Sequence, residues 1–421
     1  MVSEPEGIDL EPACETGRVA MKHVRYTRRN GGDIAQAIPG TGCRNAVFVA
    51  ALTKHLGKAV LGVVAIGLCL VGAVPGSGVP ASAATTAAVP VKYQTEFDQT
   101  RSDLDAYART IDAMPSYASN AASNHFGFVE LLDANGNRQS ALLKPGAMTG
   151  IDQSLDAFKR LGVGGVVVGV KLPLLLPQYT SQASQYARFF AMVAKAARAR
   201  GFVIDVELGA LFCGTIYADC SYTYPTSVAG WASLTAHQAR TVIDTMHPDY
   251  LDLISEPNTE AILTKIKDLQ TIDGFRSFVT DALTDIGGHG STKLMAGAAS
   301  WFPPSYDQAI IHSGIDGLIT HIYPATAETA ANLVATSRLA HDAGKPIIAD
   351  EVWLYKGQTT ASGSVQASNE QGALNCFSFW QPLDLQFIRA TREWAQKTGS
   401  PLMSGFWSWD CLLYTSDAAD E

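Results

Sequence analysis

The amino-acid sequence predicts an α/β fold, a closed barrel of eight parallel strands surrounded by helices, the (β/α)8 or TIM barrel. From residue 152 onward, helix-like and strand-like segments alternate without a break. The strand-like segments are continuous apolar runs, as expected for parallel strands that are covered on both faces. Eight such runs can be counted, and eight strands are the number that closes this barrel.

These elements follow one another along the chain. The predicted strands are 126–132, 165–172, 202–208, 250–255, 293–299, 316–322, 346–352 and 402–408. The predicted helices between them are 152–161, 182–200, 232–246, 261–286, 305–312, 327–343 and 383–397. An amphipathic helix over 97–113 precedes the barrel and is a candidate to close its base. The helix that should follow the last strand is missing, so the barrel is expected to be truncated after strand eight.

An open, doubly wound sheet is the alternative fold, because its parallel strands also alternate with helices. Dinucleotide-binding sheets of that kind carry a glycine-rich phosphate loop after an early strand. The segment Gly162-Val163-Gly164-Gly165 lacks the rest of that fingerprint. The count of eight units therefore favours the closed barrel.

Residues 1–83 are predicted to be an N-terminal extension that contains a secretory signal peptide. Residues 59–74 form an uncharged apolar run, and Ala81-Ser82-Ala83 fits a small-residue cleavage site. A membrane anchor is the alternative, but the run is shorter than the roughly 20 residues that a spanning helix needs. We expect a secreted protein, extracellular or periplasmic, without stable membrane association after cleavage. Translation is expected to start near Met21 or later.

The segment 411–421 is predicted to be a non-native tail. It resembles the in-frame translation of a transposase adaptor used to prepare sequencing libraries, although an ordinary polar tail is the alternative. We therefore expect the natural sequence to be cut near Asp410. The remaining segment, 84–410, is predicted to be a single catalytic domain.

Composition limits the partners of this domain. Hydrophobic residues make up 47% of the chain and charged residues 17%, which suits a large buried core. The net charge is −9 and no basic cluster is interleaved with aromatics, so nucleic acid is not an expected partner. Cys213 and Cys220 bracket a short polar loop and are candidates for a disulfide. No closely spaced cysteine or histidine ligands indicate zinc, so we predict no metal, no cofactor and a monomer.

Two predicted strands end in a glutamate at the carboxyl edge, where barrels of this kind hold their active sites. Strand 250–255 is followed by Glu256-Pro257, and strand 346–352 contains Glu351 near its end. Strands four and seven lie on opposing sides of an eight-stranded barrel, so the two side chains can meet across a substrate. Two carboxylates in such a position are what glycoside hydrolysis requires. Taken alone, a Glu-Pro pair at a strand end is often a solvated turn.

Aromatic and imidazole side chains end two further predicted strands. Strand six ends in His321-Ile322-Tyr323-Pro324, and strand eight ends in Trp407-Ser408-Trp409. Tryptophans at a barrel mouth commonly stack on sugar faces, although packing is the alternative for each of them. His321 is equally compatible with a core histidine that has its hydrogen bonds satisfied.

Together these motifs resemble the clan A retaining glycoside hydrolases, whose (β/α)8 barrels include the family 5 cellulases and mannanases. The resemblance covers residues 126–410 and implies that Glu256 is the acid/base and Glu351 the nucleophile. It also implies that Tyr323 contacts Glu351 and that a tryptophan of strand eight carries a sugar. The expected reaction is hydrolysis of β-glycosidic bonds in a poly- or oligosaccharide by double displacement. A raised pKa of Glu256 is expected, because a proton donor needs one.

The sequence departs from the clan pattern in two places. Ser255 stands where the clan has asparagine, and no arginine matches the one that family 5 carries near its early strands, Lys171 being the nearest candidate. These departures keep open a divergent enzyme or an inactive barrel that binds carbohydrate. A metal-dependent hydrolase is a third reading, but it needs a His-x-His motif on strand one, which is absent from 126–132.

Other polar and aromatic residues are predicted to line the same mouth. Ser255 and Asn258 flank Glu256, and Trp301 and Trp353 follow strands five and seven, so these four are predicted to bind substrate. The complete predicted substrate-binding set is Ser255, Asn258, Trp301, His321, Tyr323, Trp353, Trp407 and Trp409. Glu207 and Asp410 are reserve carboxylates near the ends of strands three and eight.

Overall fold

The computed structural model describes residues 89, 91, 94–118, 127–215, 217–354, 358–359, 365–366, 379–401 and 403–405. The predicted signal peptide, the tail and the residues Trp407, Trp409 and Asp410 lie outside this part of the chain. None of the helices in the described ranges is both long enough and apolar enough to span a bilayer.

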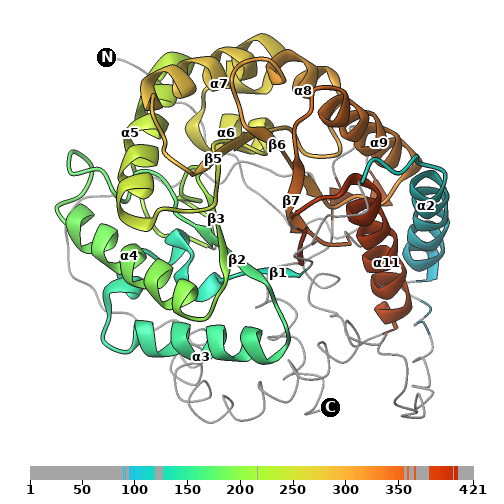
Figure 1. The fold of residues 1–421 in the computed structure, drawn as a ribbon, viewed down its shortest axis with the longest axis horizontal. Coiled ribbons are helices and arrows are strands. Elements are labelled where there is room, and N and C mark those ends of the chain that lie inside the picture. Colours follow the sequence, from blue (N-terminus) through green and yellow to red (C-terminus); the bar gives the residue numbers. More distant parts are fainter. Residues whose placement is uncertain are drawn as a thin grey trace, which may run out of the picture. The chain divides into compact units, whose positions relative to one another are not determined.

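Eight parallel strands close into a barrel in the order β1-β10-β7-β6-β5-β4-β3-β2 (Figure 1), which confirms the predicted fold and excludes the open sheet. The strands are β1 (Phe128–Glu130), β2 (Gly165–Gly169), β3 (Val203–Glu207), β4 (Tyr250–Asp252), β5 (Lys293–Ala296), β6 (Gly317–Ile322), β7 (Ile347–Val352) and β10 (Met403–Gly405). A separate antiparallel pair is formed by β8 (Gln358–Thr359) and β9 (Val365–Gln366).

Helices surround these strands, as Figure 1 shows. They are α2 (Gln94–Asp112), α3 (Ala147–Arg160), α4 (Ala183–Ala199), α5 (Val228–Met246), α6 (Pro257–Thr264), α7 (Ile272–Ile286), α8 (Ser305–Ile310), α9 (Ala327–Asp342) and α11 (Gln381–Thr398). Short 3-10 helices are η2 (Leu132–Ala134), η3 (Gly136–Leu143) and η4 (Lys267–Gln270). The single predicted helix 261–286 is wrong, because Lys265 adopts a left-handed conformation (φ 66°) that ends α6. Thr271 then caps α7 by accepting a hydrogen bond from the Gly274 amide.

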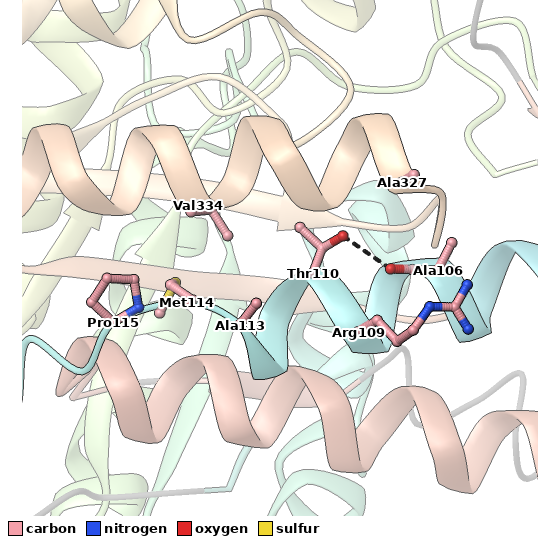
Figure 2. A pocket seen from close by; sticks show the side chains of 8 residues that line it. All are labelled: Ala106, Arg109, Thr110, Ala113, Met114, Pro115, Ala327 and Val334. Atoms are coloured by element: carbon pink, nitrogen blue, oxygen red, sulfur yellow. Dashed lines mark hydrogen bonds between the residues drawn. The ribbon is translucent and has the colours of Figure 1, made fainter.

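The helix that precedes the barrel, α2, packs between α9 and α11 in the outer ring (Figure 2). Tyr107 of α2 is fully buried, and its ring lies 5.9 Å from that of Phe387 on α11. The prediction that this helix closes the base of the barrel is therefore wrong. A hollow between α2 and α9 is lined by Ala106, Arg109, Thr110, Ala113, Met114, Pro115, Ala327 and Val334 (Figure 2).

One apolar layer fills the part of the barrel interior that is nearer the amino ends of the strands. We call this layer the floor; it consists of Phe128, Val167, Met295, Ile319 and Ile348. Gly165 makes room for the Phe128 ring, since a Cβ on Gly165 would lie only 1.9 Å from Phe128 Cε1. Residues further along the same strands therefore face the opposite, carboxyl end of the interior.

Candidate active site

Glu256 lies just beyond β4, at the residue that precedes helix α6. Pro257 occupies the first helical position, where its fixed φ and missing amide donor are tolerated. The carboxylate of Glu256 accepts a hydrogen bond from the Thr259 hydroxyl through Oε2. Its Oε1 lies 2.7 Å from Nδ1 of His321. The start of α6 thus fixes this carboxylate toward β6.

Glu351 approaches the same ring nitrogen of His321. Its Oε2 lies 3.2 Å from Nδ1 of His321. One oxygen of Glu256, one oxygen of Glu351 and a ring nitrogen of His321 all lie within 4.8 Å of one another. The structure therefore brings together the two glutamates that the sequence singled out, from strands β4 and β7.

An irregularity in β7 allows two consecutive acids to contact His321. Thr320 pairs with Ala349 but His321 pairs with Glu351, so Asp350 is an extra residue on β7. A β-bulge of this kind re-aims side chains that would otherwise alternate between the two faces of a strand. As a result, Asp350 Oδ1 lies 3.3 Å from Nε2 of His321 while Glu351 contacts Nδ1.

The pKa values of the two glutamates are ordered opposite to the expectation from the sequence. Burial raises the pKa of Glu256, but the hydrogen bond and charge of His321 outweigh it and hold that pKa below its usual value. Burial raises the pKa of Glu351 to about 7, although the charge of His321 opposes this and that of Glu256 adds to it. His321 lies closer to Glu256, which explains the order. The expected raised pKa of Glu256 is therefore wrong for the free protein.

His321 itself is 2% exposed, and acids surround it. Burial lowers its pKa, but the charges of Asp350 and Glu351 raise it well above the usual value. The Tyr323 hydroxyl lies 3.2 Å from Nδ1 of the same ring. His321 is thus the common neighbour of the groups expected to carry the chemistry.

Aromatic rings form one side of the site. The Tyr323 ring stacks on Trp301 at a centroid distance of 5.1 Å and lies 5.0 Å from the ring of Trp353. All three side chains are partly exposed. The structure therefore gathers three of the predicted sugar-binding aromatics, contributed by the ends of β5, β6 and β7.

A second charged group lies at the ends of β1, β2 and β3. Lys171 Nζ lies 2.6 Å from Oε1 of Glu207, and Asn135 donates a hydrogen bond to Oε1 of Glu130 at 2.7 Å. Burial lowers the pKa of Lys171, but Glu207, Glu130 and Glu351 together raise it above its usual value. Sequence reasoning missed Glu130. An acid within the apolar run FGFVELL was the available signal.

The two polar residues beside Glu256 take different positions. Ser255 is buried, and its side chain hydrogen-bonds to Asp252 in the barrel interior. Asn258 lies in the first turn of α6 and is partly exposed. Ser255 is therefore directed at a neighbouring acid within the protein.

The predicted disulfide between Cys213 and Cys220 is present. It closes a short loop that follows β3. Phe212, directly before this loop, donates its backbone amide to Asn137 Oδ1 at 3.0 Å. The bridge thus lies at the rim of the barrel on the carboxyl side of the strands.

No protein-family model matches the chain, and no curated protein matches it in sequence. Solved structures with a similar chain course include an exo-β-1,4-mannosidase from Opitutaceae bacterium strain TAV5. It is 15% identical, with a TM-score of 0.47, and the match covers 70% of this chain but only 54% of that one. This chain thus spans about half the length of that mannosidase.

Two further similar structures are named as glycoside hydrolases. A GH30 endoxylanase from Clostridium papyrosolvens C71 is 10% identical with a TM-score of 0.42, covering 70% of this chain and 67% of that one. GH5_18 from Bifidobacterium longum subsp. longum ATCC 55813 is 14% identical with a TM-score of 0.43, covering 68% and 69%. At these identities the likeness is one of fold, which the barrel topology establishes independently.

Proposed function

We propose that this protein is a glycoside hydrolase that cleaves β-glycosidic bonds of a poly- or oligosaccharide with retention of configuration. The observation that carries the proposal is the convergence of Glu256 and Glu351, with oxygens within 4.8 Å of each other. Retaining enzymes hold their two carboxyl groups about 5–5.5 Å apart, whereas inverting enzymes need roughly 6.5–9.5 Å to admit a water. The observed spacing supports the retaining reaction.

In this reaction Glu351 attacks the anomeric carbon as a carboxylate while Glu256 donates a proton to the leaving oxygen. Glu256 then removes a proton from the water that releases the sugar from Glu351. In the free protein the pKa order favours the proton on Glu351. Substrate binding must therefore move one proton to Glu256. His321 Nδ1 lies 2.7 Å from one carboxylate and 3.2 Å from the other, so it can give its proton to Glu256 and take up the proton of Glu351 in return.

The surroundings of the pair support a neutral carbohydrate as substrate. Trp301, Tyr323 and Trp353 offer apolar ring faces on which a pyranose can stack. At the other side of the site Lys171 is paired with Glu207, and burial raises the pKa of Glu130 well above its usual value. Lys171 is therefore not free to bind the carboxylate of a uronic acid.

A carbohydrate-binding barrel without activity is the second candidate. Two observations favour it: Ser255 is directed at Asp252, and Lys171 is paired with Glu207. Neither residue is therefore free to supply the contacts of the asparagine and arginine that clan A enzymes use. This candidate retains affinity for oligosaccharides but releases no product.

Release of reducing ends from neutral plant and microbial β-glycans, and of phenol from aryl β-glycosides, separates the two candidates. The wild type is compared with Glu256→Gln and Glu351→Gln, which retain the shape of each side chain. Turnover in the wild type that both substitutions abolish supports the hydrolase. Binding without turnover in all three proteins supports the silent barrel.

We also propose that the chain acts as a monomer outside the cytoplasm after cleavage near Ala83. The apolar run 59–74 and the small residues that follow it support export. Amino-terminal sequencing of the protein recovered from the medium or periplasm tests the cleavage site. A mature chain that still begins before residue 59 contradicts the proposal.

A further inference from the structure

Four titratable side chains lie inside the barrel, and three of them, all aspartates, take no part in the proposed reaction. We call them the interior acid cluster: Asp205 of β3, Asp252 of β4, Asp350 of β7 and His321 of β6. Asp205 and Asp252 are fully buried, and Asp350 and His321 are each 2% exposed. Three acids thus share the closed interior with one imidazole.

Most polar atoms of this cluster lack a hydrogen-bond partner within the described residues. They are both carboxylate oxygens of Asp205, both of Asp350, Oδ2 of Asp252 and Nε2 of His321. Burial of unpaired carboxylate oxygens is costly, and removing a charge from water without a partner costs still more. Asp205 lies near the others, since burial and then the charges of Asp350 and Asp252 raise its pKa. The group therefore has the donors for a cation.

The distance between two members of the cluster is compatible with a bound metal ion. Asp350 Oδ1 and Nε2 of His321 form an ion pair at 3.3 Å, which is long for a charge-assisted hydrogen bond. Two ligands that each lie about 2.1 Å from a tetrahedral ion are themselves about 3.4 Å apart. Ligand atoms of Asp252, His321 and Asp350 all lie within 4.8 Å of one another, so small side-chain shifts complete the set.

We propose that Asp252, Asp350 and Nε2 of His321 bind a divalent first-row transition ion inside the barrel, with Asp205 as a further carboxylate. Nitrogen and oxygen donors of this kind suit Zn²⁺ or Mn²⁺, whereas Ca²⁺ and Mg²⁺ prefer oxygen ligands alone. The sequence predicts no metal, because it lacks cysteine or histidine ligands that are close together along the chain. These ligands come from separate strands.

A second set, Glu256, Nδ1 of His321 and Glu351, has similar spacing but is a poorer site. Glu256 already accepts hydrogen bonds through both oxygens, from Thr259 and from His321. An ion on Nε2 instead leaves the proton of His321 on Nδ1, where it is donated to Oε1 of Glu256. Ligand histidines are commonly held by a carboxylate on the second ring nitrogen in this way. The ion would thus fix the orientation of the ring that joins the two glutamates.

The test measures metal binding without any substrate. The protein is stripped with a chelator and dialysed against Zn²⁺, and bound zinc is measured by elemental analysis. Co²⁺ substitution then reports tetrahedral coordination through its visible absorption. We expect one ion per chain, tetrahedral bands with Co²⁺ and a higher melting temperature when the ion is bound. A wild-type protein that takes up no stoichiometric ion overturns the proposal.

Variants locate the ion. Asp252→Asn and Asp350→Asn are expected to weaken zinc binding by at least about 100-fold, since each removes a direct ligand. Asp307→Asn is the matched control, because Asp307 is an equally buried acid on α8 with its own hydrogen bonds. Glu256→Gln and Glu351→Gln should retain zinc. Loss of zinc in the two glutamate variants, with retention in Asp252→Asn and Asp350→Asn, contradicts the proposed position. Circular dichroism establishes that each variant is folded.

Discussion

The floor of the barrel interior and its carboxyl-end mouth are built from the same strands but differ in chemistry. On β1, Phe128 belongs to the floor and Glu130 lies at the mouth. On β6, Ile319 is followed two residues later by His321, and on β7 Ile348 is followed by Asp350. One step of two residues along a strand therefore changes an apolar layer into a charged one.

The apolar floor stabilises the fold, whereas the charged layer next to it carries the groups expected to act in catalysis. Burial of the apolar floor stabilises the fold by about 25 cal/mol per Å² removed from water. At the mouth the burial of acids is unfavourable. It raises the pKa of Glu130, and it raises that of Glu351 although the charge of His321 opposes this shift. Acids kept in such positions reduce stability, which is typical of a site selected for chemistry. Substitutions in the two layers should therefore have opposite effects.

The largest effect is expected at the mouth. Glu256→Gln should lower kcat/KM on an oligosaccharide by about 10²–10⁴-fold, because the proton donor is lost. Glu351→Gln should lower it at least as much, because no nucleophile remains. Glu351→Gln should not lower the melting temperature, because burial raises the pKa of Glu351, whereas Glu256→Gln should lower it slightly by weakening the interaction with His321 that holds the pKa of Glu256 below its usual value. Kinetics on oligosaccharides together with thermal unfolding measure both quantities.

Two controls sharpen this result. An aryl glycoside whose leaving group needs no protonation should restore much of the first step to Glu256→Gln but nothing to Glu351→Gln. Glu393→Gln, on helix α11 and paired with Lys397 at 2.9 Å, removes an acid away from the mouth and should leave kcat/KM unchanged. Equal loss on both substrate types for Glu256→Gln would assign it a different role.

The floor should respond in the opposite sense. Phe128→Ala is expected to lower the free energy of unfolding by about 3–5 kcal/mol, since a buried ring leaves a cavity between β1 and β2. Below the melting transition, kcat/KM of the folded fraction should stay close to that of the wild type. Urea unfolding and kinetics at low temperature test this. A variant of unchanged stability with lost activity would place Phe128 in the site and break the comparison.

Much of the fold and part of the site could be predicted because they depend on local patterns. Each barrel strand reads as an apolar run in a chain that alternates between two periodicities, so the count of eight needs no tertiary information. Glu256 and Glu351 were found because an acid that ends an apolar run is a poor core residue. Helix 261–286 was predicted as one piece because its apolar pattern continues across Lys265, whose left-handed conformation leaves no sequence signal.

What could not be predicted depends on pairing between strands. The bulge at Asp350 exists only in the register between β6 and β7, and it brings two consecutive acids to one imidazole. The order of the two glutamate pKa values depends on their contacts in the folded protein, above all those with His321. Neither quantity is encoded in the spacing of residues along the chain.

A buried acid outside the barrel interior shows whether burial alone is destabilising. Burial raises the pKa of Asp307 to about 7, although hydrogen bonds from the Ala298 amide and the Thr336 hydroxyl oppose the shift. The folded state thus binds the proton more tightly than the unfolded chain, whose pKa is near 3.8. This contribution to stability is full at low pH and is lost as the pH rises through about 7.

Asp307→Asn should remove the loss of stability at high pH, because the asparagine amide has the shape of the carboxyl group and stays uncharged. Relative to the wild type, the variant should gain roughly 2–4 kcal/mol in unfolding free energy between pH 4 and pH 8. Urea unfolding at a series of pH values measures the difference. A constant offset between the two proteins at every pH would mean that the pKa of Asp307 is the same in the folded and the unfolded protein.

The smallest effect is expected at the rim, where the Cys213–Cys220 disulfide closes a loop that follows β3. The bridge spans a sequence separation of 7 residues, and constraining so short a loop in the unfolded chain contributes about 2 kcal/mol. Paired replacement of both cysteines by serine should lower the melting temperature by a few degrees and leave aryl-glycoside turnover unchanged. Treatment of the wild type with a reductant should reproduce the shift and have no effect on the variant. A loss of turnover at unchanged stability would show that this loop positions residues of the site and is part of the functional region at the mouth.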